Sequence, residues 1–294
     1  MMKRDLIGYG MNGITRQWPN NARLAISFVI NYEEGAELTP VNGDLASEVY
    51  GGGEFSLNAH SKRKRHLGME SLFEYGSRTG IWRLLRLFDT ERIPLTFFAT
   101  GFALNLNPDF CDYLGKSTHE IAGHGWRWID YTQVTKAVEK EHIQKCIASI
   151  EQLTGVRPRG WYTGRRSVYT RDLLLEMGGF VYDSDSYADD VPYFIGNHLV
   201  IPYSLDCNDF RFGTTPGFSC PNDFYDQLKS TFDYLYQENR TAMMNIGLHP
   251  RFSGHPGRCM AVKRFIDYIK KFNDIWVARR IDIAHAWLEL DRII

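Results

Sequence analysis

The stretch "RLAISFVINYEEG", residues 23–35, is a near-continuous apolar run that ends in polar residues. A strand inside a parallel sheet is covered by helices on both faces, so its sequence is apolar throughout instead of alternating. The run therefore predicts a buried parallel strand. Two adjacent glutamates, Glu33 and Glu34, follow where such a strand reaches the edge of its sheet.

The same pattern recurs along the chain, with short apolar segments separated by amphipathic ones. Seven more strands are predicted at residues 93–101, 120–125, 159–164, 179–185, 198–206, 242–250 and 275–280. Helices are predicted between them at residues 79–92, 132–155, 170–179, 221–239, 261–272 and 281–290. So many βα units in one chain of 294 residues favour an α/β barrel in a single catalytic domain, residues 1–294. The glycine-rich residues 38–67 are predicted to form a long loop after the first barrel strand.

Composition and motif content exclude several classes of protein. A formal net charge of −1 gives no overall basic surface for nucleic acid or an anionic membrane. No GxGxxG or P-loop sequence follows the first predicted strand, which removes the usual nucleotide-binding folds. Five cysteines without a CxxC pair argue against a disulfide framework and indicate a reducing compartment. Since no run of about 18 apolar residues occurs either, we expect a cytoplasmic protein with neither nucleic acid nor membrane as a partner.

Polar and aromatic side chains gather at the carboxyl ends of the predicted strands, where the active site of a parallel barrel lies. They include Glu33, Glu34, His124, Trp126, Trp128, Trp161, Tyr162, Arg165, Asp185, Asp209, His249 and Arg251. Each has an ordinary structural interpretation, such as a solvated carboxylate pair or a packed histidine. Their convergence on one rim of the barrel predicts a site there.

A metal ion at this rim would need three protein ligands and an open position for water. Glu34, His124 and a residue one helical turn further along would be the ligands. That last position holds Trp128, and an indole offers no lone pair to a metal. His249 could substitute, but it follows a different strand. The sequence therefore favours a site without a bound metal.

Four motifs resemble those of the polysaccharide deacetylase superfamily, whose strand-one motif is of type TFDDG and whose metal motif is HxxxH. They are "NYEEG" at residues 31–35, "HGWRW" at 124–128, "RPRG" at 157–160 and "GLHP" at 247–250. Glu33 and Glu34 stand for the two aspartates, and Trp128 stands for the second histidine. Longer stretches, among them "RDLIGYG", "GWYTGR" and "YDSD", are similar to the metal-independent allantoinase branch of that superfamily. The resemblance spans residues 23–287.

The resemblance implies a distorted (β/α) barrel of about seven parallel strands and a homo-oligomer, with a tetramer as the expected form. It also implies hydrolysis of a C–N bond in a cyclic amide without a cofactor, most simply (S)-allantoin to allantoate in purine degradation. Two alternatives remain open. One is a metal-dependent deacetylase of N-acetylated polysaccharides or chitooligosaccharides, and the other is an inactive binding module on the same barrel.

Hydrolysis without a metal requires side chains to activate water and to hold the oxyanion. We expect Glu33 to be the general base, because it matches the base position of the family motif. Glu34 would position substrate or water, or tune Glu33 through its charge. Arg165 would bind a ring carbonyl or the oxyanion. His124 and His249 would transfer a proton to the leaving nitrogen.

The remaining predicted site residues would bind the substrate. They are Trp126, Trp128, Trp161, Tyr162 and Asp185. The three tryptophans would form flat apolar walls that suit a small planar ring, such as a ureide or hydantoin, and exclude water.

Overall fold

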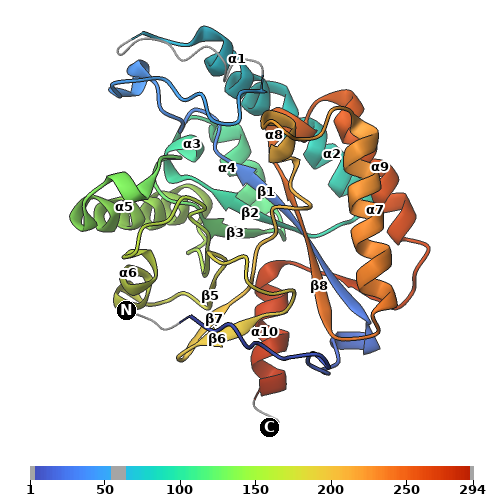
Figure 1. The fold of residues 1–294 in the computed structure, drawn as a ribbon. Coiled ribbons are helices and arrows are strands. Elements are labelled where there is room, and N and C mark those ends of the chain that lie inside the picture. The colour runs from blue at the N-terminus through green and yellow to red at the C-terminus, as the bar shows by residue number, and fades with distance from the viewer. Residues whose placement is uncertain (1–3, 54–63, 292–294) are drawn as a thin grey trace.

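The computed structural model describes residues 4–53 and 64–291, which form one mostly parallel sheet curled into a half-barrel (Figure 1). The strands lie in the order β6-β7-β5-β4-β3-β2-β1-β8, and β9 also pairs with β1. Their bounds are β1 Leu24–Tyr32, β2 Leu95–Ala99, β3 Glu120–Gly123, β4 Gly160–Trp161, β5 Tyr182–Asp183, β6 Tyr193–Ile195, β7 His198–Val200, β8 Ala242–Leu248 and β9 Ile275–Val277. The predicted parallel (β/α) barrel is thus confirmed.

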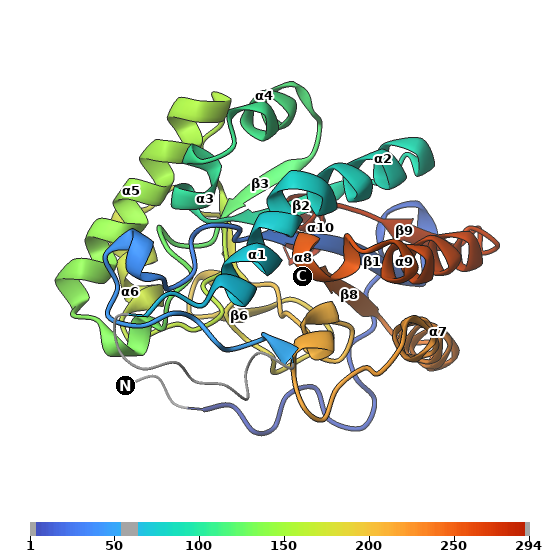
Figure 2. The same ribbon diagram turned by 90° about the horizontal axis from the view of Figure 1, so that it is seen from above.

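Helices ring the outside of the sheet, as the view from above shows (Figure 2). Their bounds are α1 Leu67–Tyr75, α2 Ile81–Glu91, α3 Gly101–Asn105, α4 Pro108–Lys116, α5 Lys136–Thr154, α6 Thr170–Met177, α7 Pro221–Gln237, α8 Pro250–Ser253, α9 Pro256–Ile269 and α10 Arg280–Asp291. A π-helical turn, Gly76–Gly80, joins α1 to α2. Within the described residues, no helix is both long and apolar enough to cross a membrane.

Strand β1 pairs with three other strands, and every one of its residues is buried. Its second half pairs with β2, its first half pairs with β9, and β8 runs along its other side (Figure 1). The apolar run at residues 23–31 therefore forms the strand that it predicts. Of the predicted loop at residues 38–67, residues 54–63 lie outside the described residues. The part before them contains one short 3-10 turn, Pro40–Asn42, and α1 begins at Leu67.

Several elements were not predicted from the sequence. Strand β6 is antiparallel to β7, and a tight turn with Gly196 at φ 60° joins the two. It was missed because its three half-buried residues are too few to show a strand period. Helices α1, α3, α4 and α8 were also missed, since each is short and supplies few turns of helical periodicity.

The half-barrel is completed by contacts that are not strand ladders. The backbone N–H of Gly247 in β8 donates to the Cys207 carbonyl at 2.9 Å, which draws the segment after β7 against β8. Lower in the barrel, the fully buried guanidinium of Arg280 crosses the interior. It donates to Ser184 at 3.1 Å, and it also donates to the carbonyls of Ile201 and Pro202 at 2.6 and 2.7 Å.

Side chains alternate across each strand, and this alternation positions the site. Phe28, Ile30 and Tyr32 face outward into the main core beneath the helices. Val29 faces inward with Phe98, Ala122, Tyr162 and Tyr203, which form a small cluster inside the barrel. Residues two positions beyond an inward side chain also face inward. This rule carries Asn31 and then Glu33 to the inner rim on β1, and His124 to the same rim on β3.

Candidate active site

Glu33 is the centre of a buried polar cluster at the carboxyl ends of three strands. Its Oε1 lies 3.0 Å from His124 Nε2 and 3.6 Å from His249 Nε2. Its Oε2 accepts a hydrogen bond from Arg251 Nη2 at 2.7 Å. We call these four residues the Glu33 cluster. Glu33 is 2% exposed, so the cluster is largely withdrawn from bulk water.

The charge of Glu33 is fixed by its neighbours. Burial alone would raise the pKa of this carboxyl, but the positive charges of Arg251 and His249 and the hydrogen bond from His124 outweigh it. They hold the pKa of Glu33 well below its usual range. Glu33 is therefore an anion at neutral pH.

His249 is oriented by a second carboxylate, Asp209. Asp209 begins a short 3-10 helix, Asp209–Gly213, and is fully buried. His249 Nδ1 lies 2.6 Å from Asp209 Oδ1, and the backbone N–H of His249 donates to Asp209 Oδ2 at 2.8 Å. Burial alone would lower the pKa of His249, yet the carboxylates of Glu33 and Asp209 raise it to about 8. At neutral pH the ring therefore carries a proton on Nε2, and this proton faces Glu33.

His124 has acceptors on both sides of its ring. Its Nδ1 faces the carbonyl oxygen of Tyr162, and its Nε2 faces the carboxylate of Glu33. A carbonyl and a carboxylate only accept, so each of these contacts is a hydrogen bond only where the facing ring nitrogen carries a hydrogen.

The other two predicted metal-ligand positions, 34 and 128, lie beside a cation. Glu34 Oε2 accepts from the backbone N–H of Glu33 at 2.8 Å, and its Oε1 lies 3.6 Å from Arg251 Nη1. The guanidinium carbon of Arg251 lies 5.1 Å from the ring of Trp128, so this cation sits beside both position 34 and position 128. Within residues 4–53 and 64–291, no group of three His, Cys, Asp or Glu side chains is placed to hold a metal ion.

Aromatic rings enclose the cluster. Trp128 is 7% exposed and packs against Phe73, with the ring centroids 5.9 Å apart. The ring of Tyr50, from the segment after β1, stacks on Trp128 at 6.4 Å. Tyr162 stacks on His124 at 5.3 Å. Of the predicted walls, Trp128 and Tyr162 therefore do lie beside the Glu33 cluster.

The other two tryptophans lie elsewhere, which corrects the prediction that they line the site. Trp161 is fully buried on the outer face of the sheet, where it packs against Phe180 and donates from Nε1 to Thr163. It is one residue out of phase with Tyr162, which faces inward. Trp126 is half-buried, packs against Phe102, and borders a separate surface pocket of about 450 Å³.

Arg165 lies on the rim and makes no contact with Glu33 among the interactions that the structure defines. Its Nη2 donates to the Trp128 carbonyl at 2.9 Å and to Glu48 at 3.2 Å, and its guanidinium covers the Trp128 ring at 4.2 Å. The prediction that it binds the oxyanion thus gives way to a role in holding Trp128 and the segment that carries Glu48.

Asp185 binds the backbone of the turn that follows β4. Its carboxylate accepts from the backbone N–H groups of Thr163 and Gly164, each at 2.9 Å. Burial and the neighbouring charge of Asp183 raise the pKa of Asp185 to about 6. Asp183 itself pairs with Arg171 at 2.6 Å. Asp185 therefore fixes the turn after β4, and the prediction of direct substrate contact is not supported by its position.

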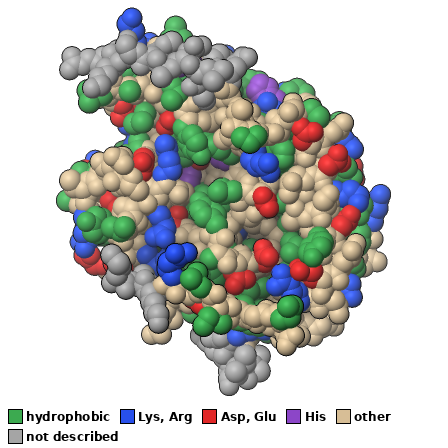
Figure 3. Space-filling model, in the orientation of Figure 1, with side chains coloured by type: hydrophobic (Ala, Val, Ile, Leu, Met, Phe, Trp, Pro, Cys, Tyr) green, Lys and Arg blue, Asp and Glu red, His purple; other side chains and the backbone are tan. Residues whose placement is uncertain are grey.

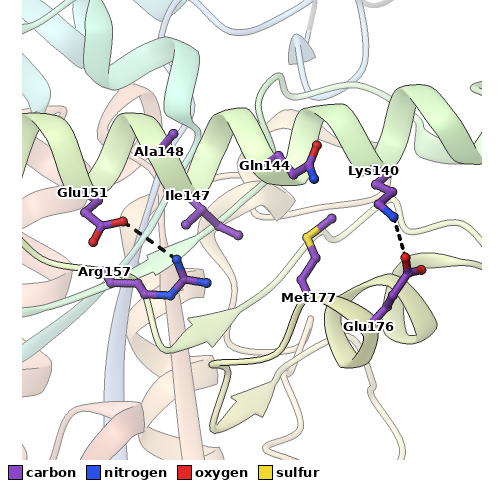
Figure 4. A pocket seen from close by; sticks show the side chains of 8 residues that line it. All are labelled: Lys140, Gln144, Ile147, Ala148, Glu151, Arg157, Glu176 and Met177. Atoms are coloured by element: carbon purple, nitrogen blue, oxygen red, sulfur yellow. Dashed lines mark hydrogen bonds and ion pairs between the residues drawn. The ribbon is translucent and has the colours of Figure 1, made fainter.

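The molecular surface is hollowed beneath the α1 region, and a histidine side chain is visible within the hollow (Figure 3). A second depression of about 460 Å³ lies between α5 and α6 (Figure 4). Its charged side chains already pair with one another, Lys140 with Glu176 and Arg157 with Glu151 at 3.8 Å. It presents no unpaired reactive group, so the Glu33 cluster is the better candidate for the active site.

Two residues of this site were not assigned roles from the sequence, although both follow predicted strands. Asp209 orients His249, and Arg251 binds Glu33. Arg251 stands two residues after His249, and an arginine so close to a strand-end histidine is a signal that could have indicated it. Nothing in the local sequence of Asp209 marks it, since its contact with His249 joins segments 40 residues apart.

Comparison with known proteins agrees with the observed fold. The family model for polysaccharide deacetylases matches residues 59–178. A putative polysaccharide deacetylase of Schizosaccharomyces pombe is 36% identical over 97% of this chain and 96% of its own. A probable polysaccharide deacetylase of Pseudomonas aeruginosa has a crystal structure that is 47% identical, with a TM-score of 0.94, covering 97% of this chain and 98% of that one.

A further crystal structure, that of Puue allantoinase, is also 47% identical, with a TM-score of 0.94 and 97% of each chain covered. These relatives span the whole fold, and the two solved structures share the barrel with this chain. The chain therefore belongs to the polysaccharide deacetylase family of hydrolases, and its fold is shared with an allantoinase.

Proposed function

We propose that this protein hydrolyses a C–N bond of a small cyclic amide, and that (S)-allantoin, converted to allantoate, is its substrate. The observation that carries the proposal is the Glu33 cluster, in which an ionised carboxylate faces two histidines while an arginine stands beside the positions expected to bind a metal. Such a cluster can supply a base and an acid from side chains alone.

In this reaction Glu33 removes a proton from water, and the water oxygen forms a bond to the ring carbonyl carbon. His249 donates its Nε2 proton to the ring nitrogen as the C–N bond breaks. The product acid then releases its proton to the solvent and Glu33 passes its proton to His249, so the products are a carboxylate and a nitrogen that has gained one hydrogen. The 3.6 Å between Glu33 Oε1 and His249 Nε2 places the base and the acid close enough to serve one tetrahedral centre.

Negative charge on the carbonyl oxygen develops beside His124 and Arg251. The fixed positive charge of Arg251, in a site that excludes water, stabilises such an oxyanion by several kcal/mol. This arrangement requires no Lewis acid, so we propose that the reaction proceeds without a metal ion.

The enclosure of the cluster favours a small substrate over a polymer. Tyr50 lies on Trp128, and Glu48 ties the same segment to Arg165, so the space above Glu33 is walled by aromatic rings. A sugar polymer needs an open groove on both sides of the reacting bond. The similarity to Puue allantoinase supports the smaller substrate, whereas the names of the other relatives favour a deacetylase.

The test is a comparison of purified protein on (S)-allantoin and on an N-acetylated chitooligosaccharide, with Glu33→Gln as the inactive control. We expect allantoate from the wild type, no acetate from the oligosaccharide, and neither product from the variant. Release of acetate alone would establish the deacetylase alternative. Absence of turnover on both substrates would favour the binding module.

A further inference from the structure

The guanidinium of Arg251 occupies an unusual place. The residue is 1% exposed and lies under three aromatic rings, at 4.4 Å from Phe73 and 5.1 Å from both Trp128 and Phe252. An arginine buried in this way is costly unless carboxylates compensate its charge. Glu33 and Glu34 do so from the same side of the barrel.

The backbone around Arg251 is built to bring it there. Arg251 lies in α8, which directly follows β8 and packs on the π-helical turn Gly76–Gly80. A Cβ at Gly80 would stand 2.1 Å from the Pro250 carbonyl oxygen. A Cβ at Gly76 would stand 2.5 Å from Glu34 Oε1 and 2.9 Å from the backbone nitrogen of Arg251. Only glycine at both positions lets α8 approach closely enough to insert Arg251 between the two glutamates.

The two glutamates differ in state, and one of the neighbours that cause the difference is Arg251. It donates a hydrogen bond to Glu33 at 2.7 Å but lies 3.6 Å from Glu34. Burial raises the pKa of Glu34 to about 7; Arg251 opposes this rise, and the charge of Glu33 adds to it. Two adjacent buried carboxylates therefore do not share the charge equally, and Glu33 keeps it.

We infer that Arg251 is a built-in cation that takes the place of a catalytic metal, and that it acts as a positioning residue for Glu33. It touches the neighbours that a metal would have touched, at positions 34 and 128. Its planar fork also keeps Oε2 of Glu33 occupied, so that Oε1 alone faces His124 and His249. The role in turnover rests on the proposed function, whereas the role as an internal cation does not.

The test uses two variants of Arg251 and a matched control. Arg251→Ala removes the cation, and Arg251→Lys keeps a charge but replaces the fork by a single ammonium that cannot serve both glutamates. Arg279→Lys is the control, because Arg279 makes a comparable two-point contact with Asp282 at the start of α10. Circular dichroism and thermal unfolding identify the variants that fold.

Removal of one partner from a buried ion pair predicts a loss of about two to three orders of magnitude in kcat/KM for Arg251→Ala. Guanidinium ion should restore that activity by about tenfold or more when it is added far below the concentration that unfolds the protein. A tenfold gain corresponds to the same free energy as a shift of one pKa unit. It should do nothing for Glu33→Gln or for Arg279→Lys. The acid limb of the pH profile should move to higher pH in Arg251→Lys.

A folded Arg251→Ala protein with wild-type turnover would overturn the inference. So would a loss that guanidinium does not restore together with an unchanged acid limb in Arg251→Lys, since a purely structural side chain gives that result.

If the wild type does not hydrolyse allantoin, the proposed function fails alone, and ¹³C NMR of the Glu33 carboxyl then decides the inference without a substrate. Glu33 should take up its proton at higher pH in Arg251→Lys than in the wild type, and identical titrations would contradict the inference.

Discussion

Replacement of Asp209 by Asn tests how the acid of this site is made. The carboxylate of Asp209 accepts from His249 Nδ1 at 2.6 Å, from the His249 backbone at 2.8 Å and from the Ser253 backbone at 3.0 Å. An asparagine of the same shape can keep both backbone contacts, since both use Oδ2, but the N–H₂ group that then replaces Oδ1 cannot accept from Nδ1–H. Asp209→Asn therefore removes the negative charge beside His249 and the hydrogen bond that orients its ring.

The magnitude follows from the pKa of His249. Glu33 and Asp209 together raise it from 6.5 to about 8 against the effect of burial. One pKa unit corresponds to about 1.4 kcal/mol of interaction with the charged ring. Without Asp209 the pKa should fall, because burial disfavours the imidazolium and Glu33 alone opposes it. Loss of a general acid typically reduces turnover by about two to four orders of magnitude.

The assay is kcat for allantoin as a function of pH, in the wild type and in Asp209→Asn. Since the protonated ring is the active form, wild-type activity should persist below pH 8 and fall as pH rises through about 8. In the variant, kcat should be lower and its basic limb should lie at lower pH. The same raised pKa stabilises the fold below pH 6.5, and that stabilisation is lost as pH rises through about 8. A variant with wild-type kcat and an unmoved basic limb would refute this reasoning.

Three further predictions follow from the same contacts. Glu33→Gln should lower kcat by about two to four orders of magnitude, and it should also lower the midpoint of thermal unfolding because the buried charge of Arg251 loses its nearest carboxylate, as steady-state kinetics and calorimetry would show. Gly76→Ala should destabilise the protein by about 1–3 kcal/mol in urea unfolding, because its Cβ would meet Glu34, whereas Gly257→Ala, with its nearest contact at 3.4 Å, should be close to neutral. Trp161→Phe should reduce stability by about 1–3 kcal/mol while kcat/KM stays near that of the wild type, since the indole lies in the core.

Most of the fold could be predicted from the sequence, because a parallel strand that is buried on both faces shows an apolar run in its own residues. The run at residues 23–31 became β1, and the glutamates after it became the rim of the site. The same reasoning failed where a segment was too short to show a period, as in β6 and α8. Its success therefore depended on segment length as much as on hydrophobicity.

The site was predicted less completely, and strand phase explains part of the difference. His124 and Tyr162 face inward, whereas Trp161 is one residue out of phase and faces the helices. The alternation is readable from sequence once the inner face of each strand is known. Phase on the two-residue strand β4 could not be read, because so short a strand contains no repeat of the pattern.

Long-range contacts explain why the role of Arg251 was not predicted from the sequence. Arg251 reaches Glu33 across 218 positions of sequence, and the approach depends on glycines in a third segment, Gly76–Gly80. Arg165, which was predicted from the sequence to bind a ring carbonyl or the oxyanion, is closer to Glu33 in sequence but is held at the rim by Glu48 and Trp128. No local pattern distinguishes the two arginines, because the difference lies in how the helices around the barrel pack.

The central claim is that side chains of the Glu33 cluster, with Arg251 as their cation, hydrolyse a small cyclic amide without a metal. The most direct measurement is kcat for (S)-allantoin in protein stripped of metal by exhaustive chelation, with the residual metal content determined by mass spectrometry. The account predicts full turnover at a metal content far below one ion per chain, and no gain when Zn²⁺ is returned. Activity that disappears with the metal and returns with Zn²⁺ would contradict it.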